Sequence, residues 1–172
     1  AFFLAASGRR GPVVIDLPMN VQRGAIDPSD CRPAVKRTDI APSVPMDKIE
    51  TLAQWISTAQ RPVILAGGGV IACGAYAELR ALADKYRIPV TMSMPGMGAY
   101  PSAAPLSLGL CGYAGSQYAN MAMYKSDLLI GIGTTFHLRQ TGSLPAKTVE
   151  QGRVARIDLD INELRHSRVP LD

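Results

Sequence analysis

Short apolar runs, each bounded by glycine or proline, constrain the fold of this chain more than any other feature. Val63–Ala66 follows a proline and precedes three glycines, and it contains no polar residue. Such a run is typical of a strand that is covered on both faces, as in a parallel sheet. Similar runs recur along the chain with helical patterns between them, which predicts βαβ units with right-handed crossovers. We therefore expect an α/β protein with a doubly wound parallel sheet between two layers of helices.

The positions of these elements follow from the spacing of apolar residues and from the breakers between them. The expected strands are Val63–Ala66, Ile88–Met92, Asp127–Gly133 and Val154–Asp160. The expected helices are Ile49–Ile56, Ala72–Tyr86, Ser116–Lys125 with Tyr118, Met121 and Ala122 facing inward, and a short one from Ile161 to Arg165. Residues 101–114 contain several prolines and glycines, and we expect a loop there.

The N-terminal part of the chain has a different pattern. Val13–Leu17 is a short apolar run that ends at a proline, and it predicts one more buried strand. From Met19 to Val44 the periodicity disappears and prolines are frequent, which is typical of an interdomain linker. We expect an N-terminal piece at residues 1–24, a linker at 25–44 and a domain at 45–172.

Composition excludes several classes of function. The 172 residues are 47% hydrophobic and 19% charged, which indicates a globular protein, and no apolar run approaches the ~20 residues of a membrane helix. The net charge of +4 comes from scattered basic residues, so we expect no nucleic acid and no membrane among the partners. Cys31, Cys73 and Cys111 are far apart, which argues against a disulfide framework and a zinc site. We expect no metal site in this chain.

The first ten residues do not resemble a signal peptide, because no charged segment precedes their apolar stretch. There is no initiator Met either. A cytoplasmic protein, of which this chain is one part, is our expectation.

The carboxyl ends of the predicted strands are rich in glycine and form the candidate ligand edge. These segments are Gly67–Gly69, Gly96–Gly98 and Gly131–Gly133. In an open parallel sheet, ligands bind at this edge, and glycine lets the backbone approach a phosphate. Gly67–Ala72 fits the G-x-G-x-x-A pattern, but Thr91–Ser93 lacks the acid that would hold a ribose in a dehydrogenase. The glycines favour a variant nucleotide site; tight packing of helix against strand is the alternative.

Candidate catalytic side chains are few. His137 and His166 are the two histidines, and no nucleophile elbow, P-loop lysine or zinc-binding helix motif occurs. We expect both histidines to be surface or loop residues and no catalytic residue in this chain. Asp158 and Asp160 could accept hydrogen bonds from ribose or adenine, or could cap the helix that follows. Arg139 could pair with a pyrophosphate, or form a surface salt bridge.

Several stretches together resemble thiamine-diphosphate enzymes of the acetolactate synthase type. Gly8–Gln22 is similar to the end of their N-terminal, pyrimidine-binding domain, and Arg61–Gly69 to the opening of their central domain. The stretches that continue in the family's order are Ile88–Thr91, Gly96–Pro101, Leu108–Gly112, Ala119–Asn120, Ser126–Ile130, Arg139–Gly142 and Ile157–Asp160. The resemblance therefore covers nearly the whole chain and assigns residues 1–24 to the tail of the preceding domain.

This resemblance implies a Rossmann-like central domain with six strands, the last of which we expect to be missing here. In acetolactate synthases the central domain holds FAD, and in oxalyl-CoA decarboxylase relatives it holds ADP. By position, the residues expected at such a ligand are Gly67, Gly68, Gly69, Thr91, Gly96, Met97, Leu108, Gly109, Arg139 and Asp158. The chain departs from the family's acetolactate synthases near the flavin: Cys111 stands where they have a histidine, and His137 and Leu138 where they have two acids.

The resemblance also implies what lies outside this chain. The family's activating glutamate lies upstream and its Mg²⁺- and diphosphate-binding element downstream, so thiamine diphosphate and Mg²⁺ would belong to the intact enzyme. We expect that enzyme to be a homodimer or homotetramer that decarboxylates a 2-oxo acid or joins it to a second carbonyl, with this fragment inactive alone. Two alternatives are a stand-alone nucleotide-binding module that regulates or scaffolds, and an NAD-dependent deacylase-like domain.

Overall fold

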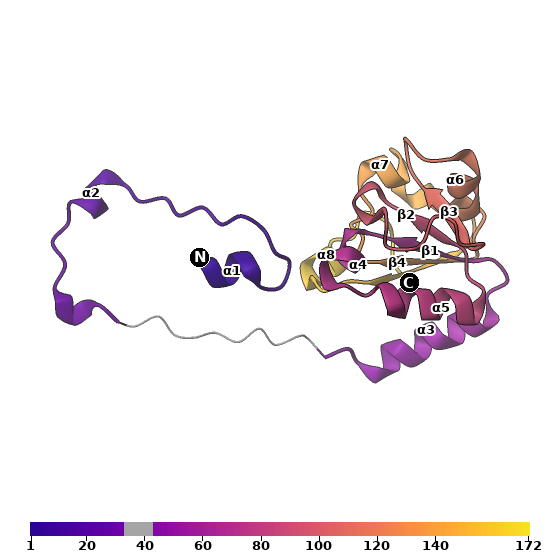
Figure 1. Cartoon of the computed structure of the whole chain (residues 1–172), viewed down its shortest axis with the longest axis horizontal. Coiled ribbons are helices and arrows are strands. Elements are labelled where there is room, and N and C mark those ends of the chain that lie inside the picture. The colour runs from indigo at the N-terminus through magenta and orange to yellow at the C-terminus, as the bar shows by residue number, and fades with distance from the viewer. Residues whose placement is uncertain (33–42) are drawn as a thin grey trace. The chain divides into compact units, whose positions relative to one another are not determined.

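The computed structural model describes residues 1–32 and 43–172, and the chain divides into two compact units. The N-terminal segment, Ala1–Ser43, contains the short helices α1 (Phe2–Ala6) and α2 (Met19–Gln22) and the 3-10 turn η1 (Pro28–Asp30) (Figure 1). The sheet domain, Val44–Asp172, contains all the strands of the described residues. Part of the predicted linker, residues 33–42, lies outside the described residues.

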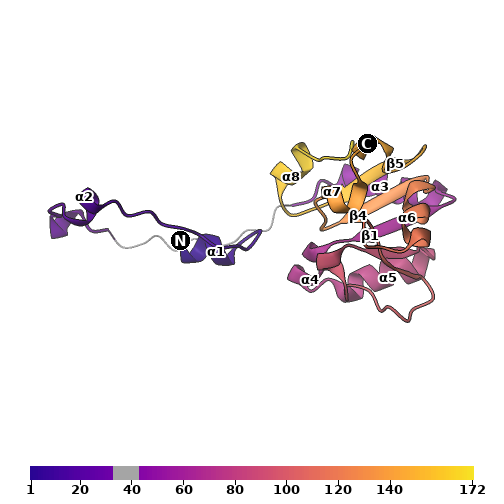
Figure 2. The ribbon, with the colours of Figure 1, turned by 90° about the horizontal axis from the view of Figure 1, so that it is seen from above.

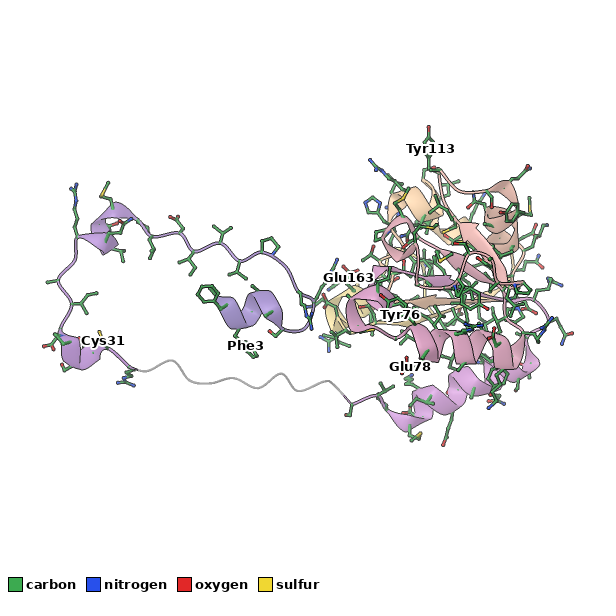
Figure 3. All side chains as sticks on the ribbon, viewed as in Figure 1. Phe3, Cys31, Tyr76, Glu78, Tyr113 and Glu163 are labelled. Carbon is green, nitrogen blue, oxygen red and sulfur yellow. The ribbon has the colours of Figure 1, made fainter. Side chains whose placement is uncertain are left out.

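The predicted strand at Val13–Leu17 is wrong. These residues belong to no strand, and Val14 is 90% exposed. An isolated strand leaves its backbone donors and acceptors unpaired, and no described residue pairs with this run. No side chain in the described part of the N-terminal segment is buried, including that of Phe3 (Figure 3).

The sheet has five parallel strands in the order β3-β2-β1-β4-β5. The strands are β1 (Pro62–Ala66), β2 (Val90–Met92), β3 (Ser107–Leu110), β4 (Leu128–Ile132) and β5 (Arg153–Ile157). Because β1 pairs with β2 on one side and β4 on the other, the direction of winding reverses between β1 and β4. This is the predicted Rossmann-like, doubly wound arrangement, and its central strand β1 is buried from Val63 to Ala66.

Helices cover both faces of the sheet, as Figures 1 and 2 show. One face packs against α3 (Met46–Thr58), α4 (Gly68–Cys73) and α5 (Tyr76–Tyr86). The other face packs against α6 (Gln117–Tyr124) and the loop before α7 (Leu138–Thr141). The 3-10 turns η2 (Met94–Gly96) and η3 (Pro145–Lys147) and the helix α8 (Ile161–Arg165) complete the domain. The predicted three-layer αβα fold is confirmed.

Two apolar clusters, one on each face, hold these layers together. Leu79 and Ala83 of α5 pack with Ile64 and Ile130 of the sheet on the first face. Ala119 and Met123 of α6 pack on the second face, with the alternate strand residues Val63, Leu65 and Leu129. This alternation follows from the two-residue period of a strand, which sends successive side chains to opposite faces.

Four of the five strands were predicted, and the strand that was not is β3, at the edge of the sheet. Residues 101–114 were expected to form a loop, but Ser107–Leu110 pairs with β2 at the edge of the sheet. The strand is short, Gly109 interrupts it with φ of +71°, and the register shifts between Val90 and Thr91. Glycine and a break in register remove the alternation by which a strand is recognised in sequence.

Two details of the helices also differ from the prediction. The expected helix over Ala72–Tyr86 is divided into α4 and α5 at Gly74, whose φ of +73° ends α4 in the left-handed conformation that favours glycine. The expected inward face of α6 is rotated, because Ala119 and Met123 are buried while Tyr118 and Met121 are largely exposed. The apolar exposed residues of this short helix obscured its period.

No helix in the described part of the chain is both long enough and apolar enough to cross a membrane.

Candidate functional site

The carboxyl edge of the sheet brings the predicted ligand residues together. Since all five strands are parallel, their carboxyl ends meet at one edge, where Gly67, Ser93, Cys111, Gly133 and Asp158 follow β1 to β5 in chain order. Of the predicted set, the residues that follow strand ends at this edge are Gly67, Gly68, Gly69, Gly96, Met97 and Asp158. Thr91 lies within β2, Leu108 and Gly109 lie within β3, and Arg139 lies in α7. The roles of its members differ, as their contacts show.

The glycines at the end of β1 allow close contact between two backbones. A Cβ on Gly67 would lie 2.1 Å from the carbonyl oxygen of Gly133, and one on Gly69 would lie 2.7 Å from the Gly133 Cα. The Gly67 N–H donates to the Ile132 carbonyl at 2.8 Å, and the Gly69 N–H donates to the Gly133 carbonyl at 2.9 Å. These two amides are thus already used at the switch point, which is the packing alternative considered above.

Packing continues from β1 to β2 but leaves Gly68 more freedom. A Cβ on Gly96 would lie 2.3 Å from the Ala66 carbonyl oxygen, so Gly96 is also required by a backbone contact. A Cβ on Gly68 would meet the Pro95 Cβ at 3.0 Å, a side-chain contact that is less severe than the backbone contacts at Gly67 and Gly69. Gly68 is therefore the least closely packed member of the Gly67–Gly69 group.

The edge opens on the β2–β3 side. Gly98 and Gly109 both have positive φ, and no atom lies within 4 Å of a Cβ built on either. Met97 is 42% exposed, whereas Leu108 is half-buried against the second apolar cluster. Thr91 is fully buried, and its hydroxyl donates to the Gly109 carbonyl at 3.0 Å. Thr91 thus supports the β2–β3 contact, and the space lies over the glycines.

The end of β5 is organised by a buried arginine. The Arg156 side chain is inaccessible to solvent, and its Nη2 donates to Asp158 Oδ2 at 2.7 Å and to Glu163 Oε2 at 3.2 Å. Its Nη1 also donates to the Glu163 carbonyl, which fixes α8 over the strand end. Asp158 Oδ1 accepts from the Asp160 N–H at 3.1 Å. Each oxygen of Asp158 therefore has one partner and keeps one lone pair for another donor.

Asp160 and His137 both cap helices. Asp160 accepts from the Asn162 N–H at 3.0 Å at the start of α8, so the capping alternative applies to it. His137 Nδ1 accepts from the Arg139 N–H at 3.3 Å at the start of α7, and its expected place on a surface loop is confirmed. His166 is exposed at the end of α8.

The loop before α7 is held by Phe136, which has a positive φ of 48° although it is not glycine. A left-handed conformation costs about 1–2 kcal/mol, and full burial of the ring against the sheet offsets it. The helix that follows this loop, α7, presents Arg139 at the surface, where its guanidinium makes no hydrogen bond or ion pair with any described residue. The surface salt bridge considered for Arg139 is thus not present among the described residues.

Sequence reasoning missed a pocket beside this loop. The α6–α7 pocket, of about 690 Å³, lies between α6, α7 and η3. Its lining residues are Gly112, Tyr113, Asn120, Met123, Tyr124, Leu138, Arg139, Gln140, Thr141, Gly142, Ser143, Lys147 and Thr148. Only Arg139 of the predicted set lines it. No pattern in the sequence indicated it, because its walls come from segments that only the crossover between β3 and β5 brings together.

Cys111 follows β3 and is 4% exposed. Burial raises the pKa of its thiol from 9.0 to about 11, so the group is protonated at neutral pH. A protonated buried thiol is a poor nucleophile and a poor metal ligand. Across residues 1–32 and 43–172, no three His, Cys, Asp or Glu residues are grouped as a metal site would require.

Comparison with known families adds to this geometry. The family model described as "Thiamine pyrophosphate enzyme, central domain" matches residues 49–171, which span most of the sheet domain. This chain belongs to that family. The match begins within α3 and ends after β5 and α8, so it includes every strand end described above.

Curated relatives of this chain include several acetolactate synthases. The chain is 41% identical over 169 residues to the probable acetolactate synthase large subunit of Methanocaldococcus jannaschii. The matched region is 95% of this chain and 28% of that protein. It is 37% identical over 173 residues to acetolactate synthase 1, chloroplastic, of Zea mays, and this match covers 99% of the chain and 27% of that protein. The chain therefore spans a little over a quarter of the length of these relatives.

A solved structure supports the fold. A protein described as a thiamin diphosphate-dependent enzyme isolated from Mycobacterium smegmatis matches with a TM-score of 0.73 and 23% identity. The match covers 99% of this chain and 32% of that one. At this identity, the likeness concerns the fold.

Proposed function

We propose that this chain is the central-domain part of a thiamine-diphosphate-dependent 2-oxo acid decarboxylase or carboligase of the acetolactate synthase type. The observation that carries the proposal is the family match over residues 49–171 together with 41% identity to an acetolactate synthase subunit across 95% of the chain. In this proposal the intact enzyme is a homodimer or homotetramer, and thiamine diphosphate and Mg²⁺ bind to segments outside this chain. Residues 1–24 are the tail of its pyrimidine-binding domain, and 25–44 are a linker.

We infer no catalytic residue in this chain. The two histidines are exposed, one of them as a helix cap, and the thiol of Cys111 is buried and protonated. Decarboxylation and carboligation require an electron sink, which thiamine diphosphate supplies. The contribution of the sheet domain is then structural, with a nucleotide as its own ligand.

The nucleotide in this proposal is FAD or ADP, and the carboxyl edge has groups that fit one. A Cβ on Gly98 or Gly109 would meet no atom within 4 Å, so a ligand can approach the backbone closely at both positions. The guanidinium of Arg139, which has no partner among the described residues, fits a diphosphate, and Asp158 keeps lone pairs for ribose hydroxyls. Gly67, Gly69 and Gly96 shape the edge through their backbone contacts, and Thr91 fixes β2 to β3 beside it.

Binding of ADP and FAD to the full chain tests the nucleotide. Isothermal titration measures the affinity, and a visible flavin absorbance after purification identifies FAD. Arg139→Gln removes the charge but keeps a polar side chain, so we expect about a tenfold loss of affinity for ADP. Arg165→Gln, at an exposed position in the last turn of α8, is the matched control and leaves the affinity unchanged.

Two results would contradict the proposal at different points. Equal ADP affinity in the Arg139 and Arg165 variants would show that the nucleotide does not lie on this edge. The catalytic part is tested separately, with the full-length gene product, thiamine diphosphate, Mg²⁺ and a 2-oxo acid. Failure of that protein to release CO₂ from any 2-oxo acid tried would reject the enzyme class even if the sheet domain binds ADP.

A further inference from the structure

The charged and amide side chains of the α6–α7 pocket that have no partner among the described residues are all hydrogen-bond donors, and two of them are positively charged. Arg139 and Lys147 are its two charged lining residues, and no Asp or Glu lines it. Neither cation makes an ion pair or side-chain hydrogen bond with a described residue. Glu150, which accepts a hydrogen bond from the hydroxyl of the lining residue Tyr124 at 3.5 Å, lies outside the lining and is paired with Lys125 at 2.7 Å. An anion would therefore meet no repulsion from the lining.

The acceptors in the lining are already used. Asn120 Oδ1 accepts from the Gly112 N–H at 2.7 Å, and its Nδ2 donates to the Gly112 carbonyl at 2.9 Å. Gln140 Oε1 accepts from both the Thr134 hydroxyl and the His137 N–H, which leaves its NH₂ group without a described partner. The hydroxyls of Thr141 and Thr148 donate to backbone carbonyls. The groups left for a ligand are the Arg139 guanidinium, the Lys147 ammonium, the Gln140 amide and the Ser143 hydroxyl.

The walls of the pocket are fixed before any ligand arrives. The Tyr113 N–H donates to the Arg139 carbonyl at 2.8 Å, and Gly112 is packed so closely that a Cβ would lie 2.2 Å from that same oxygen. Another lining residue, Gly142, is held in place because its carbonyl accepts from Arg168 Nη2 at 3.2 Å. A preformed pocket does not lose ordering entropy on binding, which favours a small ligand.

The remaining lining is apolar and aromatic. Met123 is buried, Tyr124 is half-buried, and Leu138 is half-exposed at the rim. The ring of Tyr113 points away from the domain (Figure 3) and is 95% exposed, so it lines the mouth only. The volume of about 690 Å³ is within the range of ~300–1,000 Å³ that holds small organic molecules.

We propose that the α6–α7 pocket is a second binding site, distinct from the nucleotide edge, for a small aromatic or apolar molecule that carries a phosphate or carboxylate. The anionic group pairs with Lys147 and Arg139, and the ring packs on Met123 and Tyr124. The site shares only Arg139 with the proposed nucleotide edge. Lys147 comes from η3 and follows none of the strand ends, so it belongs to this pocket and not to the proposed nucleotide edge.

Phenyl phosphate is the probe that tests this site on the full chain. In a titration followed by ¹H–¹⁵N NMR, we expect shifts of the Gly142, Ser143 and Lys147 amides and none of Gly67 or Gly69. Lys147→Gln weakens binding about tenfold, whereas Lys48→Gln, at an exposed position on α3, changes it less than twofold. Met123 is not varied, because its burial makes it part of the core.

Each comparison ligand decides one part of the proposal. Neutral phenol should give no pocket shifts, and inorganic phosphate should bind several-fold more weakly than phenyl phosphate. Equal binding of inorganic phosphate would reject the aromatic component, and equal binding of phenol would reject the anionic one. Absence of shifts with phenyl phosphate, or shifts unaffected by Lys147→Gln, overturns the site. Because Lys147 does not belong to the nucleotide edge, ADP affinity in this variant reports on the proposed function independently.

Discussion

The two halves of the carboxyl edge use glycine for opposite purposes. At the switch point between β1 and β4, Gly67, Gly69 and Gly133 bring two backbones into direct contact. On the β2–β3 side, Gly98 and Gly109 adopt positive φ and leave open space around them. A glycine-rich strand end is therefore not by itself a phosphate site, since the same residue also serves close packing of the chain against itself.

This difference changes where a ligand can bind. Amides that donate to carbonyls of the same domain, as those of Gly67 and Gly69 do, are not free for a phosphate. The guanidinium of Arg139, in contrast, has no hydrogen-bond or ion-pair partner among the described residues. We call the β1–β4 side, with Gly67, Gly69 and Gly133, the closed half of the edge, and the β2–β3 side, with Gly98 and Gly109, the open half. The closed half is a rigid support. The open half has space for a ligand, and the adjacent α6–α7 pocket has both space and positive charge.

The largest effect is expected where the edge is closed. Gly67→Ala places a Cβ 2.1 Å from the Gly133 carbonyl oxygen, which forces β1 and β4 apart. Overpacking a core costs about 1–3 kcal/mol, and a clash with backbone at the centre of the sheet should reach the upper end, about 3 kcal/mol. Urea unfolding measures the change in the free energy of unfolding.

The matched variant is Gly109→Ala on the open half. Its Cβ meets no atom within 4 Å, but φ of +71° strains an alanine, so we expect a loss of only about 1 kcal/mol. Equal losses for the two variants would mean that the two halves do not differ in packing, and the comparison would be wrong.

At the end of β5, the ion pairs of Arg156 hold the structure together instead of a contact between two backbones. We therefore expect a loss in the free energy of unfolding that lies between those of the two glycine variants. Arg156→Met removes the buried partner of Asp158 and Glu163 and frees α8. Both carboxylates are only partly exposed, so we expect a loss of about 2 kcal/mol, less than for a fully buried pair. Arg80→Gln on α5 breaks an exposed pair with Asp84 and should cost less than about 0.5 kcal/mol. Thermal unfolding of both variants checks this, and a loss from Arg156→Met no larger than that from Arg80→Gln would contradict it.

The fold could be predicted to a large extent from the sequence, because long-range organisation followed from local patterns. Val63–Ala66 and Leu128–Ile132 are uninterrupted apolar runs, and buried parallel strands have few other sequence signatures. β3 was missed because Gly109 and a shift in register break its alternation. Val13–Leu17 was wrongly assigned as a strand. An apolar run indicates that its side chains favour burial, but it does not show that another strand is available to pair with it.

The candidate site could be predicted less well. The strand ends could be assigned to one edge because parallel strands align their carboxyl ends, but the contacts of each residue depend on atoms remote in sequence. Nothing near Gly67 indicates that Gly133 fills the space beside it. Likewise, Lys147 and Asn120 line one pocket through a crossover that no local pattern encodes. Resemblance to a family supplied positions, whereas packing decides which of them are free.

The smallest effect is expected at Cys111, which tests how far solvent penetrates the open half. Cys31 and Cys73 are exposed, and iodoacetamide at pH 8 should alkylate both while Cys111 stays unmodified in the folded chain. Mass spectrometry of the digested protein measures this. The pKa of the Cys111 thiol is raised from 9.0 to about 11, so the folded state retains its proton longer than the unfolded state. Its contribution to stability is therefore complete below pH 9 and is lost as the pH rises toward 11.

A comparison with Cys111→Ala isolates that contribution from the other groups that titrate in alkali. The free energy of unfolding of the wild type should fall relative to that of the variant between pH 9 and 11, and the difference should be constant from pH 6 to 8. Rapid alkylation of Cys111 at pH 8 would show that water reaches the end of β3. The solvent-accessible region on the β2–β3 side would then include the end of β3 at Cys111 and would not stop at Gly109.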